Sequence, residues 1–140
     1  MKLSIIIPVY NTEDYIRQCI ESVLNIKNIQ TEIVVVNDGS TDRSLAILEE
    51  YAEKNNNIKI ITQENQGASA ARNTGIRVCT GDYIYFLDSD DWIDTDSFEK
   101  IIEELESGYK SNNEIDVVVG KEKAYSEFTK EEILDERIPV

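Results

Sequence analysis

The sequence predicts an α/β fold, with a mostly parallel, Rossmann-like sheet and helices on both of its faces. Short apolar runs of strand type alternate with segments in which apolar residues recur at helical spacing, in the order βαβαβαβαβ. Strand–helix alternation of this kind favours parallel strands joined by crossover helices. The first run, Leu3–Val9, is apolar almost throughout, which is typical of a strand that is buried on both faces.

The first half of the chain supplies two strand–helix units. The strand at Leu3–Val9 is followed by a helix, and a second strand is predicted at Glu32–Asn37, around a run of β-branched residues. Ser40 or Thr41 can cap the helix that comes next. The apolar faces of the two helices consist of Tyr15, Ile16, Cys19, Ile20, Val23 and Leu24 in the first and of Leu45, Leu48 and Ala52 in the second.

The second half continues the same alternation. Strands are predicted at Ile58–Ile61, Tyr83–Leu87 and Ile115–Val119, and helices at Ala68 to about Val78 and at about Asp96 to Tyr109. Residues 121–140 are polar, so they are expected to form a tail or a frayed helix outside the packed domain.

Composition and charge restrict the classes of function. The 140 residues are enough for one domain with one core. They carry 28 acidic and 14 basic side chains, and the resulting net charge of −14 argues against nucleic acid or an anionic membrane surface as a partner. The chain has no histidine, which excludes His-based catalysis and His-ligated zinc.

The cysteines and the apolar runs bear on the cellular location. Cys19 and Cys79 are too few for a disulfide scaffold, and both are expected to be reduced thiols. No apolar stretch approaches the ~18 residues of a membrane span, and the first apolar run is too short for a signal peptide. The chain is therefore expected in the cytoplasm, either free or peripheral to the inner face of the membrane.

Three carboxylates lie within four residues at the end of a predicted strand. Tyr83–Leu87 is followed by Asp88, Ser89, Asp90 and Asp91. Carboxylates this close repel one another unless a cation offsets their charge, and Mg²⁺ or Mn²⁺ takes carboxylate oxygens together with water and substrate phosphate. The motif therefore indicates a metal–diphosphate site. The alternative is an acidic turn whose aspartates face solvent, because Asp and Ser are ordinary turn residues.

Two further strand ends are polar, and ligands of open α/β sheets bind at the carboxyl ends of the strands. The first strand ends in Pro8, Val9, Tyr10 and Asn11, and the second ends in a turn that contains Asp38. Tyr10 can stack on a base or pack over the sheet edge. Asp38 can accept a hydrogen bond from an imide N–H, such as N3 of uracil, or it can cap the next helix.

Arg72 is the candidate diphosphate ligand. It lies among Ala and Ser residues near the start of a predicted helix, where free N–H groups also favour anions. The alternative is an ordinary salt bridge to an acidic neighbour. Gly67 and Gly75, on either side of Arg72, match neither G-x-G-x-x-G nor a Walker A loop, so nicotinamide and P-loop sites are not indicated.

Several motifs together resemble those of family 2 glycosyltransferases, a large inverting family with the GT-A nucleotide-sugar fold. These motifs occupy Ser4–Asn11, Glu13–Ile16, Cys19–Leu24, Glu32–Asp42, Asn65–Gly67, Ala71–Asn73 and Gly81–Trp92, in the family's order over residues 3 to 120. The resemblance implies that residues 1–120 form a nucleotide-sugar-binding domain. It also implies that residues 121–140 are a polar tail or the start of an acceptor-binding half.

The resemblance implies a role for each matched residue. The base and ribose would lie along Pro8, Val9, Tyr10 and Asn11, with the base held by Asp38, the diphosphate near Arg72, and the ribose side of the donor near Asp88 and Ser89. Asp88 and Asp90 match the family's D-x-D motif, so Asp90 would be the main ligand of a Mn²⁺ or Mg²⁺ ion, with Asp91 as a further acid. The family's usual donor is a UDP-sugar or another nucleoside-diphosphate sugar.

The function implied is donor binding for inverting transfer to a saccharide or lipid-linked acceptor. In the family, the general base and the acceptor site belong to a half that follows the resembling part, so no residue here is assigned as catalytic. The alternative is a non-catalytic nucleotide-sugar-binding fragment or subunit, and the chain alone is expected to transfer sugar weakly or not at all. A bare strand edge would also favour homo-oligomers.

Overall fold

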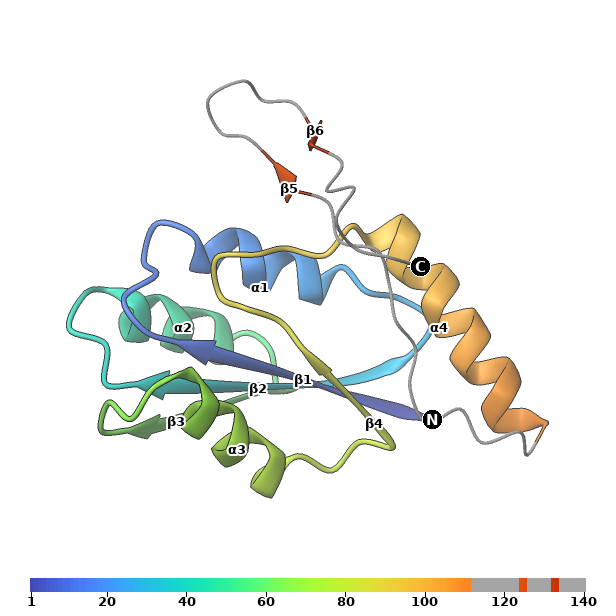
Figure 1. The fold of residues 1–140 in the computed structure, drawn as a ribbon, viewed down its shortest axis with the longest axis horizontal. Coiled ribbons are helices and arrows are strands. Elements are labelled where there is room, and N and C mark those ends of the chain that lie inside the picture. Colours follow the sequence, from blue (N-terminus) through green and yellow to red (C-terminus); the bar gives the residue numbers. More distant parts are fainter. Residues whose placement is uncertain (112–123, 126–131, 134–140) are drawn as a thin grey trace.

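The computed structural model describes residues 1–111, 124–125 and 132–133 (Figure 1). Four strands form a parallel sheet in the order β3-β2-β1-β4: β1 at Lys2–Val9, β2 at Gln30–Asp38, β3 at Ile58–Gln63 and β4 at Tyr83–Phe86. A separate antiparallel pair joins β5, Ala124–Tyr125, to β6, Glu132–Ile133. The predicted α/β class is confirmed. The strand predicted at 115–119 and most of the tail predicted at 121–140 lie outside the described residues.

Helices cover both faces of the four-stranded sheet. One face carries α1 (Ile16–Leu24), α2 (Ser44–Ala52) and α4 (Thr95–Lys110), and the other carries α3 (Ala68–Val78) (Figure 1). Side chains of β1 alternate between the two cores: Ile5 and Ile7 belong to the larger core, whereas Ile6 packs with Ala71 of α3. None of the described helices is long and apolar enough to span a membrane.

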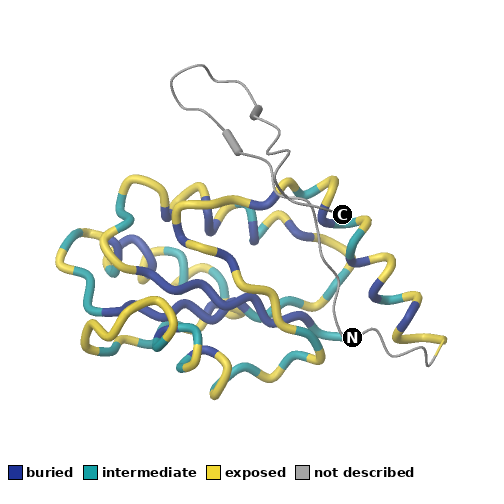
Figure 2. Tube along the Cα trace, in the orientation of Figure 1, coloured by how far each residue is buried: buried dark blue, intermediate teal, exposed yellow. Residues whose placement is uncertain are grey.

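The two central strands are buried on both faces. Residues 3–9 of β1 and 33–38 of β2 are buried without exception, as the dark blue tube in Figure 2 shows. This burial explains why their sequences are nearly continuous apolar runs. β4 lies at an edge of the sheet, and its Ile84, Tyr85 and Phe86 are 41%, 37% and 44% exposed.

The predicted cap of α2 is wrong. Its first residue, Ser44, donates its N–H to Oδ1 of Asp42 at 2.8 Å, and neither Ser40 nor Thr41 caps the helix. Both of those residues bond instead to Asn11 of the loop after β1, through Ser40 Oγ at 3.1 Å and the Thr41 N–H at 2.7 Å. Ser40 and Thr41 therefore bond to a residue of a distant segment, Asn11, and not to the nearby start of α2.

The buried faces of the first two helices also differ in part from the prediction. Tyr15 precedes α1 and is 40% exposed, so it does not extend that helix's buried stripe. In α2 the buried stripe is Ser44, Ile47 and Leu48, at i, i+3 and i+4, and Leu45 lies beside it, only partly buried.

Helix α3 lies close to β1 because it carries a glycine where it packs on that strand. A Cβ atom added at Gly75 would lie 2.4 Å from Cγ2 of Ile6, well inside van der Waals contact. Gly75 is thus required by packing, although glycine disfavours a helix by about 1 kcal/mol relative to alanine.

Gly75→Ala should therefore destabilise the domain even though alanine is the better helix former. Overpacking costs about 1–3 kcal/mol, of which helix propensity restores about 1 kcal/mol, so the net loss in free energy of unfolding should reach about 2 kcal/mol. Urea denaturation followed by circular dichroism measures this loss, with Ser69→Ala, an exposed position on α3, as the control. A Gly75→Ala protein as stable as the control would contradict the close contact with Ile6.

Candidate functional site

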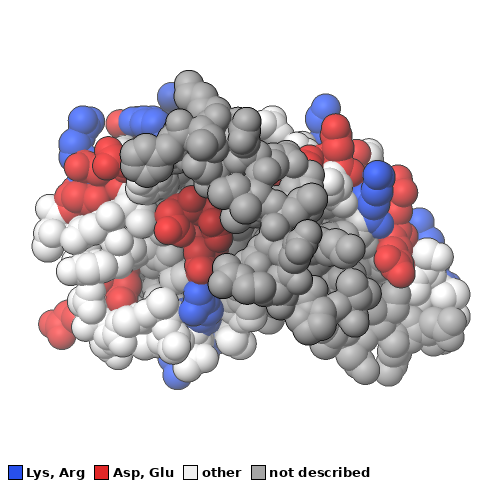
Figure 3. Space-filling view, turned by 45° about the horizontal axis from the view of Figure 1, so that its top comes forward, with Lys and Arg blue, Asp and Glu red and all other residues white. Residues whose placement is uncertain are grey.

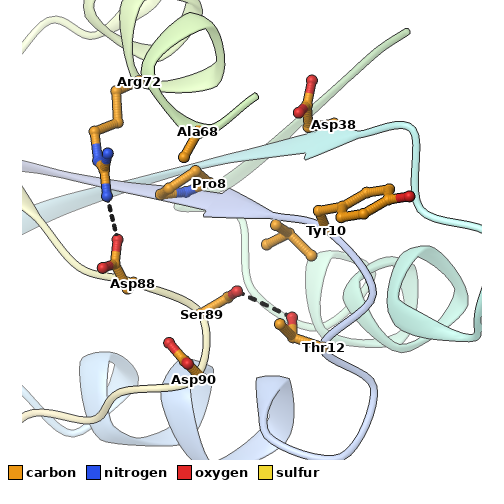
Figure 4. A pocket seen from close by; sticks show the side chains of 10 residues that line it. Pro8, Tyr10, Thr12, Asp38, Ala68, Arg72, Asp88, Ser89 and Asp90 are labelled. Carbon is orange, nitrogen blue, oxygen red and sulfur yellow. Dashed lines mark hydrogen bonds and ion pairs between the residues drawn. The ribbon is translucent and has the colours of Figure 1, made fainter. Parts of the chain in front are cut away.

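An open pocket of about 210 Å³ lies where β1, β2 and β4 end, beside the start of α3 (Figure 4). It is lined by Pro8, Val9, Tyr10, Thr12, Asp38, Ala68, Arg72, Asp88, Ser89 and Asp90. Every site residue predicted from the sequence lines it except Asn11 and Asp91. Small-molecule sites typically measure ~300–1,000 Å³, so these residues account for only part of the contacts that a nucleotide-sized ligand would need.

Asp38 is a buried carboxylate that holds the segment between β3 and α3. Its side chain lies at the end of β2, and the residue is 2% exposed. Oδ1 accepts hydrogen bonds from Nε2 of Gln63 at 2.8 Å and from the N–H of Gln66 at 2.9 Å, and Oδ2 accepts one from the N–H of Gly67 at 2.8 Å. Since Gly67 immediately precedes α3, Asp38 fixes where that helix begins.

These hydrogen bonds decide the charge state of Asp38. Burial disfavours the ionised form, but the donors of Gln63, Gln66 and Gly67 outweigh burial, and the pKa of Asp38 lies below its usual value. The alternative role predicted from the sequence, a cap for α2, is wrong, because the side chain of Asp38 bonds instead to Gln63 at the end of β3 and to the backbone of the turn before α3.

Arg72 reaches across the pocket from α3 to the loop after β4. Its Nη2 lies 2.5 Å from Oδ1 of Asp88, and the two side chains are 33% and 52% exposed (Figure 4). The candidate diphosphate ligand is therefore paired with a candidate metal ligand. Partly exposed pairs of this kind contribute little to stability, about 0–1 kcal/mol.

The acidic loop after β4 is held at several points. Ser89 accepts a hydrogen bond from Thr12 Oγ1 at 3.0 Å (Figure 4), and the N–H of Asp91 donates to the carbonyl of Asp88 at 3.0 Å. Farther along, the N–H of Ile93 donates to Ser22 Oγ of α1 at 3.0 Å. The position of the aspartates is thus set by contacts with the loop after β1 and with α1.

Cys19 of α1 lies directly behind this loop. Its Sγ donates to the carbonyl of Asp88 at 3.7 Å. Burial raises the pKa of the Cys19 thiol to about 12, and the negative charges of Asp91, Asp90 and Asp88 add to the shift. Cys19 and Cys79 are both free, as the sequence predicts, and the Cys19 thiol stays protonated at neutral pH.

Asn11 joins two loops and does not line the pocket. Its backbone has φ of 50°, a left-handed conformation that asparagine tolerates. Its Oδ1 accepts hydrogen bonds from the N–H groups of Thr41 and Asp42 at 2.7 and 3.3 Å. A second bridge runs in both directions, because Glu13 N–H donates to Asp42 Oδ2 at 3.1 Å and Arg43 N–H donates to Glu13 Oε2 at 3.0 Å.

The residues that line the pocket can hold a divalent cation only if further ligands complete its coordination. Figure 3 shows acidic side chains gathered at the centre of one face, with a basic side chain beside them. Across the part of the chain that the structure describes, no three acidic or cysteine side chains are arranged so that they could hold a metal ion. Asp88 and Asp90 line the pocket and Asp91 does not. Mg²⁺ is often bound by one or two carboxylates plus substrate phosphates, and these two aspartates fit that arrangement.

Sequence reasoning did not identify Thr12 and Ala68. Thr12 donates its N–H to Ser44 Oγ at 3.0 Å, and its carbonyl accepts from Tyr15 and Ile16, so it closes the turn that leads into α1. A threonine just ahead of a predicted helix was the available signal. Ala68 is the first residue of α3, and its small side chain leaves the helix N-terminus open to the pocket.

Comparison with known sequences gives a consistent family. A sequence model of glycosyl transferase family 2 matches residues 4–137. The chain is 43% identical to glycosyltransferase GlyA of Streptococcus pneumoniae over 126 residues, which are 90% of this chain and 17% of that protein. It is 51% identical to the putative glycosyltransferase EpsH of Bacillus subtilis over 100 residues, 71% of this chain and 29% of that protein. The chain thus spans less than a third of either relative.

Solved structures agree on the fold. S. aureus TarS 1–349 in complex with UDP-GlcNAc has a TM-score of 0.70 at 33% identity, over 78% of this chain and 32% of that one. The mannosyltransferase PcManGT from Pyrobaculum calidifontis, in complex with GDP-Man and Mn²⁺, has a TM-score of 0.68 at 24% identity, over 74% and 32%, and shares the fold. With a parallel sheet of GT-A type and a family match over nearly its whole length, this chain belongs to glycosyl transferase family 2.

Proposed function

We propose that this chain binds a nucleoside-diphosphate sugar, with a UDP-sugar as the donor, and that it does so as part of an inverting glycosyltransferase. The observation that carries the proposal is the pocket in which an exposed aromatic ring, a buried carboxylate and an arginine come together. These are Tyr10 after β1, Asp38 at the end of β2 and Arg72 on α3. The complex of S. aureus TarS with UDP-GlcNAc supports this class of donor.

The base would lie between Tyr10 and Asp38. Tyr10 is 50% exposed at the pocket, and its ring offers a flat apolar surface on which a uracil can stack. A carboxylate has about four acceptor positions. Asp38 uses three of them for described donors, so Oδ2 retains one for an N–H of the base.

The diphosphate would replace Asp88 as the partner of Arg72. Because the Arg72–Asp88 pair is partly exposed, a ligand with two phosphates can displace Asp88 from Arg72 at a small cost in free energy. Asp88 would then be free to act with Asp90 and the diphosphate oxygens as ligands of Mn²⁺ or Mg²⁺. When bound, such an ion supplies positive charge that stabilises the departing diphosphate.

Inverting transfer also needs a general base on the face of the sugar opposite the diphosphate. The carboxylates that line the pocket are assigned above to the nucleobase and the metal, so we assign no general base to this chain. The general base and the site for a saccharide or lipid-linked acceptor would come from the part of the longer relatives that this chain does not match. Binding without transfer is therefore the second candidate function for this chain alone.

UDP should bind this chain more tightly with Mn²⁺ than with EDTA, and Asp90→Asn should abolish the difference. The variant should be as stable as the wild type or slightly more so, because it removes one of several like charges. Titration calorimetry measures binding, and thermal denaturation measures stability. Asp14→Asn removes an exposed acid outside the pocket and is the control. Unfolding of Asp90→Asn would make this acid structural, and equal UDP affinity with Mn²⁺ and EDTA would remove the metal from the proposal.

Arg72→Gln should weaken binding of UDP and leave binding of uridine nearly unchanged. A hydrogen bond to a charged group contributes about 1.5–3 kcal/mol, which corresponds to a loss of roughly 10- to 150-fold in UDP affinity. Arg77→Gln removes the same charge from an exposed position of α3 outside the pocket and serves as the matched control. If uridine and UDP lost affinity equally, Arg72 would be supporting the pocket wall and not binding the diphosphate.

A further inference from the structure

We infer that Gln63 is a positioning residue of the nucleotide pocket, which it does not itself line: it holds Asp38 and α3 in a fixed relation to each other. This inference rests on the proposed function, because it concerns the same site. Gln63 is the last residue of β3 and stands opposite Asp38 in the parallel pairing of β2 with β3. Its side chain is partly buried between that strand end and α3.

The amide of Gln63 uses its two ends for two different elements. Nε2 donates to Oδ1 of Asp38 at 2.8 Å, and Oε1 accepts from Oγ1 of Thr74 on α3 at 2.7 Å. An ionised carboxylate only accepts, so the amide nitrogen must face Asp38 and the amide oxygen must face Thr74. The link therefore has one orientation, and it ties the end of β2 to Thr74 in the second turn of α3.

Two sides of the pocket depend on this link. Asp38 would hold the base, and its other hydrogen bonds, from Gln66 and Gly67, set the start of α3. The same helix carries Arg72, which would bind the diphosphate. Because Gln63 bonds to Asp38 directly and to α3 through Thr74, it fixes the spacing between the base contact and the diphosphate contact.

Glutamine is suited to this position because it is neutral and bifunctional. A methionine would fill similar space but would leave one acceptor position of Asp38 without its donor. A glutamate would place a second carboxylate at hydrogen-bond distance from Asp38, and two such groups cannot both stay ionised without repulsion. One of them would have to bind a proton to restore the hydrogen bond.

Gln63→Glu therefore gives a test that separates positioning from general stability. At low pH the introduced carboxyl is protonated and can donate to Asp38 as the amide does. As the pH rises through the raised pKa of the pair, both groups ionise, repel and spread apart. The UDP affinity of Gln63→Glu, divided by that of the wild type at the same pH, should fall about tenfold between pH 5 and pH 8, which corresponds to a pKa of the pair that is about one unit higher in the UDP-bound chain than in the free chain.

The groups that surround Gln63 belong to three segments. Asp38 faces Gln63 from β2, Glu64 follows it in an exposed position, and α3 contributes the uncharged Thr74. The wild-type reference cancels every effect of pH that the two proteins share, including the titration of the UDP phosphates. Gln66→Glu adds the same charge three residues later, through an exposed side chain, and keeps the backbone N–H that bonds to Asp38, so it measures the long-range effect of that charge.

Calorimetric titration of UDP at pH 5, 6.5 and 8, below the melting temperature of each variant, gives the result. The inference is supported if the affinity ratio falls with pH for Gln63→Glu and stays level for Gln66→Glu. Gln63→Met, which adds no charge, should bind UDP severalfold more weakly at every pH, and it tests the inference if Gln63→Glu does not fold. Lower melting temperatures with wild-type UDP affinity in both Gln63 variants would overturn the inference alone. A wild-type chain that binds no UDP at any pH would overturn the proposed function, and the inference with it.

Discussion

The burial of one charged carboxylate at the end of β2 is the constraint on which the site depends. A buried charge is costly unless hydrogen bonds stabilise it, and Asp38 is surrounded by N–H donors from the end of β3 and the turn before α3. To deliver those donors, the chain must turn sharply at Gly67, where φ is 93°. Helix α3 begins where this turn ends, so the side chains it brings to the pocket are placed by a charge on a different element.

The sequence was sufficient to predict the four described parallel strands and the edge of the sheet at which the pocket lies. Both follow from patterns within single segments: the apolar runs of the central strands, and polar residues at carboxyl ends that any parallel sheet brings to one edge. It could not predict which polar groups bond across that edge. Asn11 and Thr41 are 30 positions apart, and Asp38 and Gly67 are 29 apart. Such pairs depend on distances between segments, and a pattern within one segment does not contain them. The hydrogen bond between Thr12 and Ser89, which are 77 positions apart, escaped prediction for the same reason.

The pocket also indicates how a strongly acidic protein would accommodate the acidic ligand that we propose for it. Neutral N–H donors satisfy Asp38, so that carboxylate needs no cation. Arg72, the basic side chain among the described lining residues, is thereby left to Asp88, in a pair weak enough to exchange. The remaining acid, Asp90, has no such partner among the lining residues and would be offset by a cation that arrives with the ligand. The buried carboxylate is thus stabilised by neutral donors, and the arginine pairs with the more exposed carboxylate.

The double bridge between the loops after β1 and β2 has a consequence for engineering. Asn11 and Glu13 in the first loop each exchange hydrogen bonds with the second loop, at residues 40–43. A graft of either loop alone from another family member would leave several backbone N–H groups without acceptors. Chimeras intended to alter donor preference should therefore carry both loops from the same parent, since the pair behaves as one exchangeable cassette.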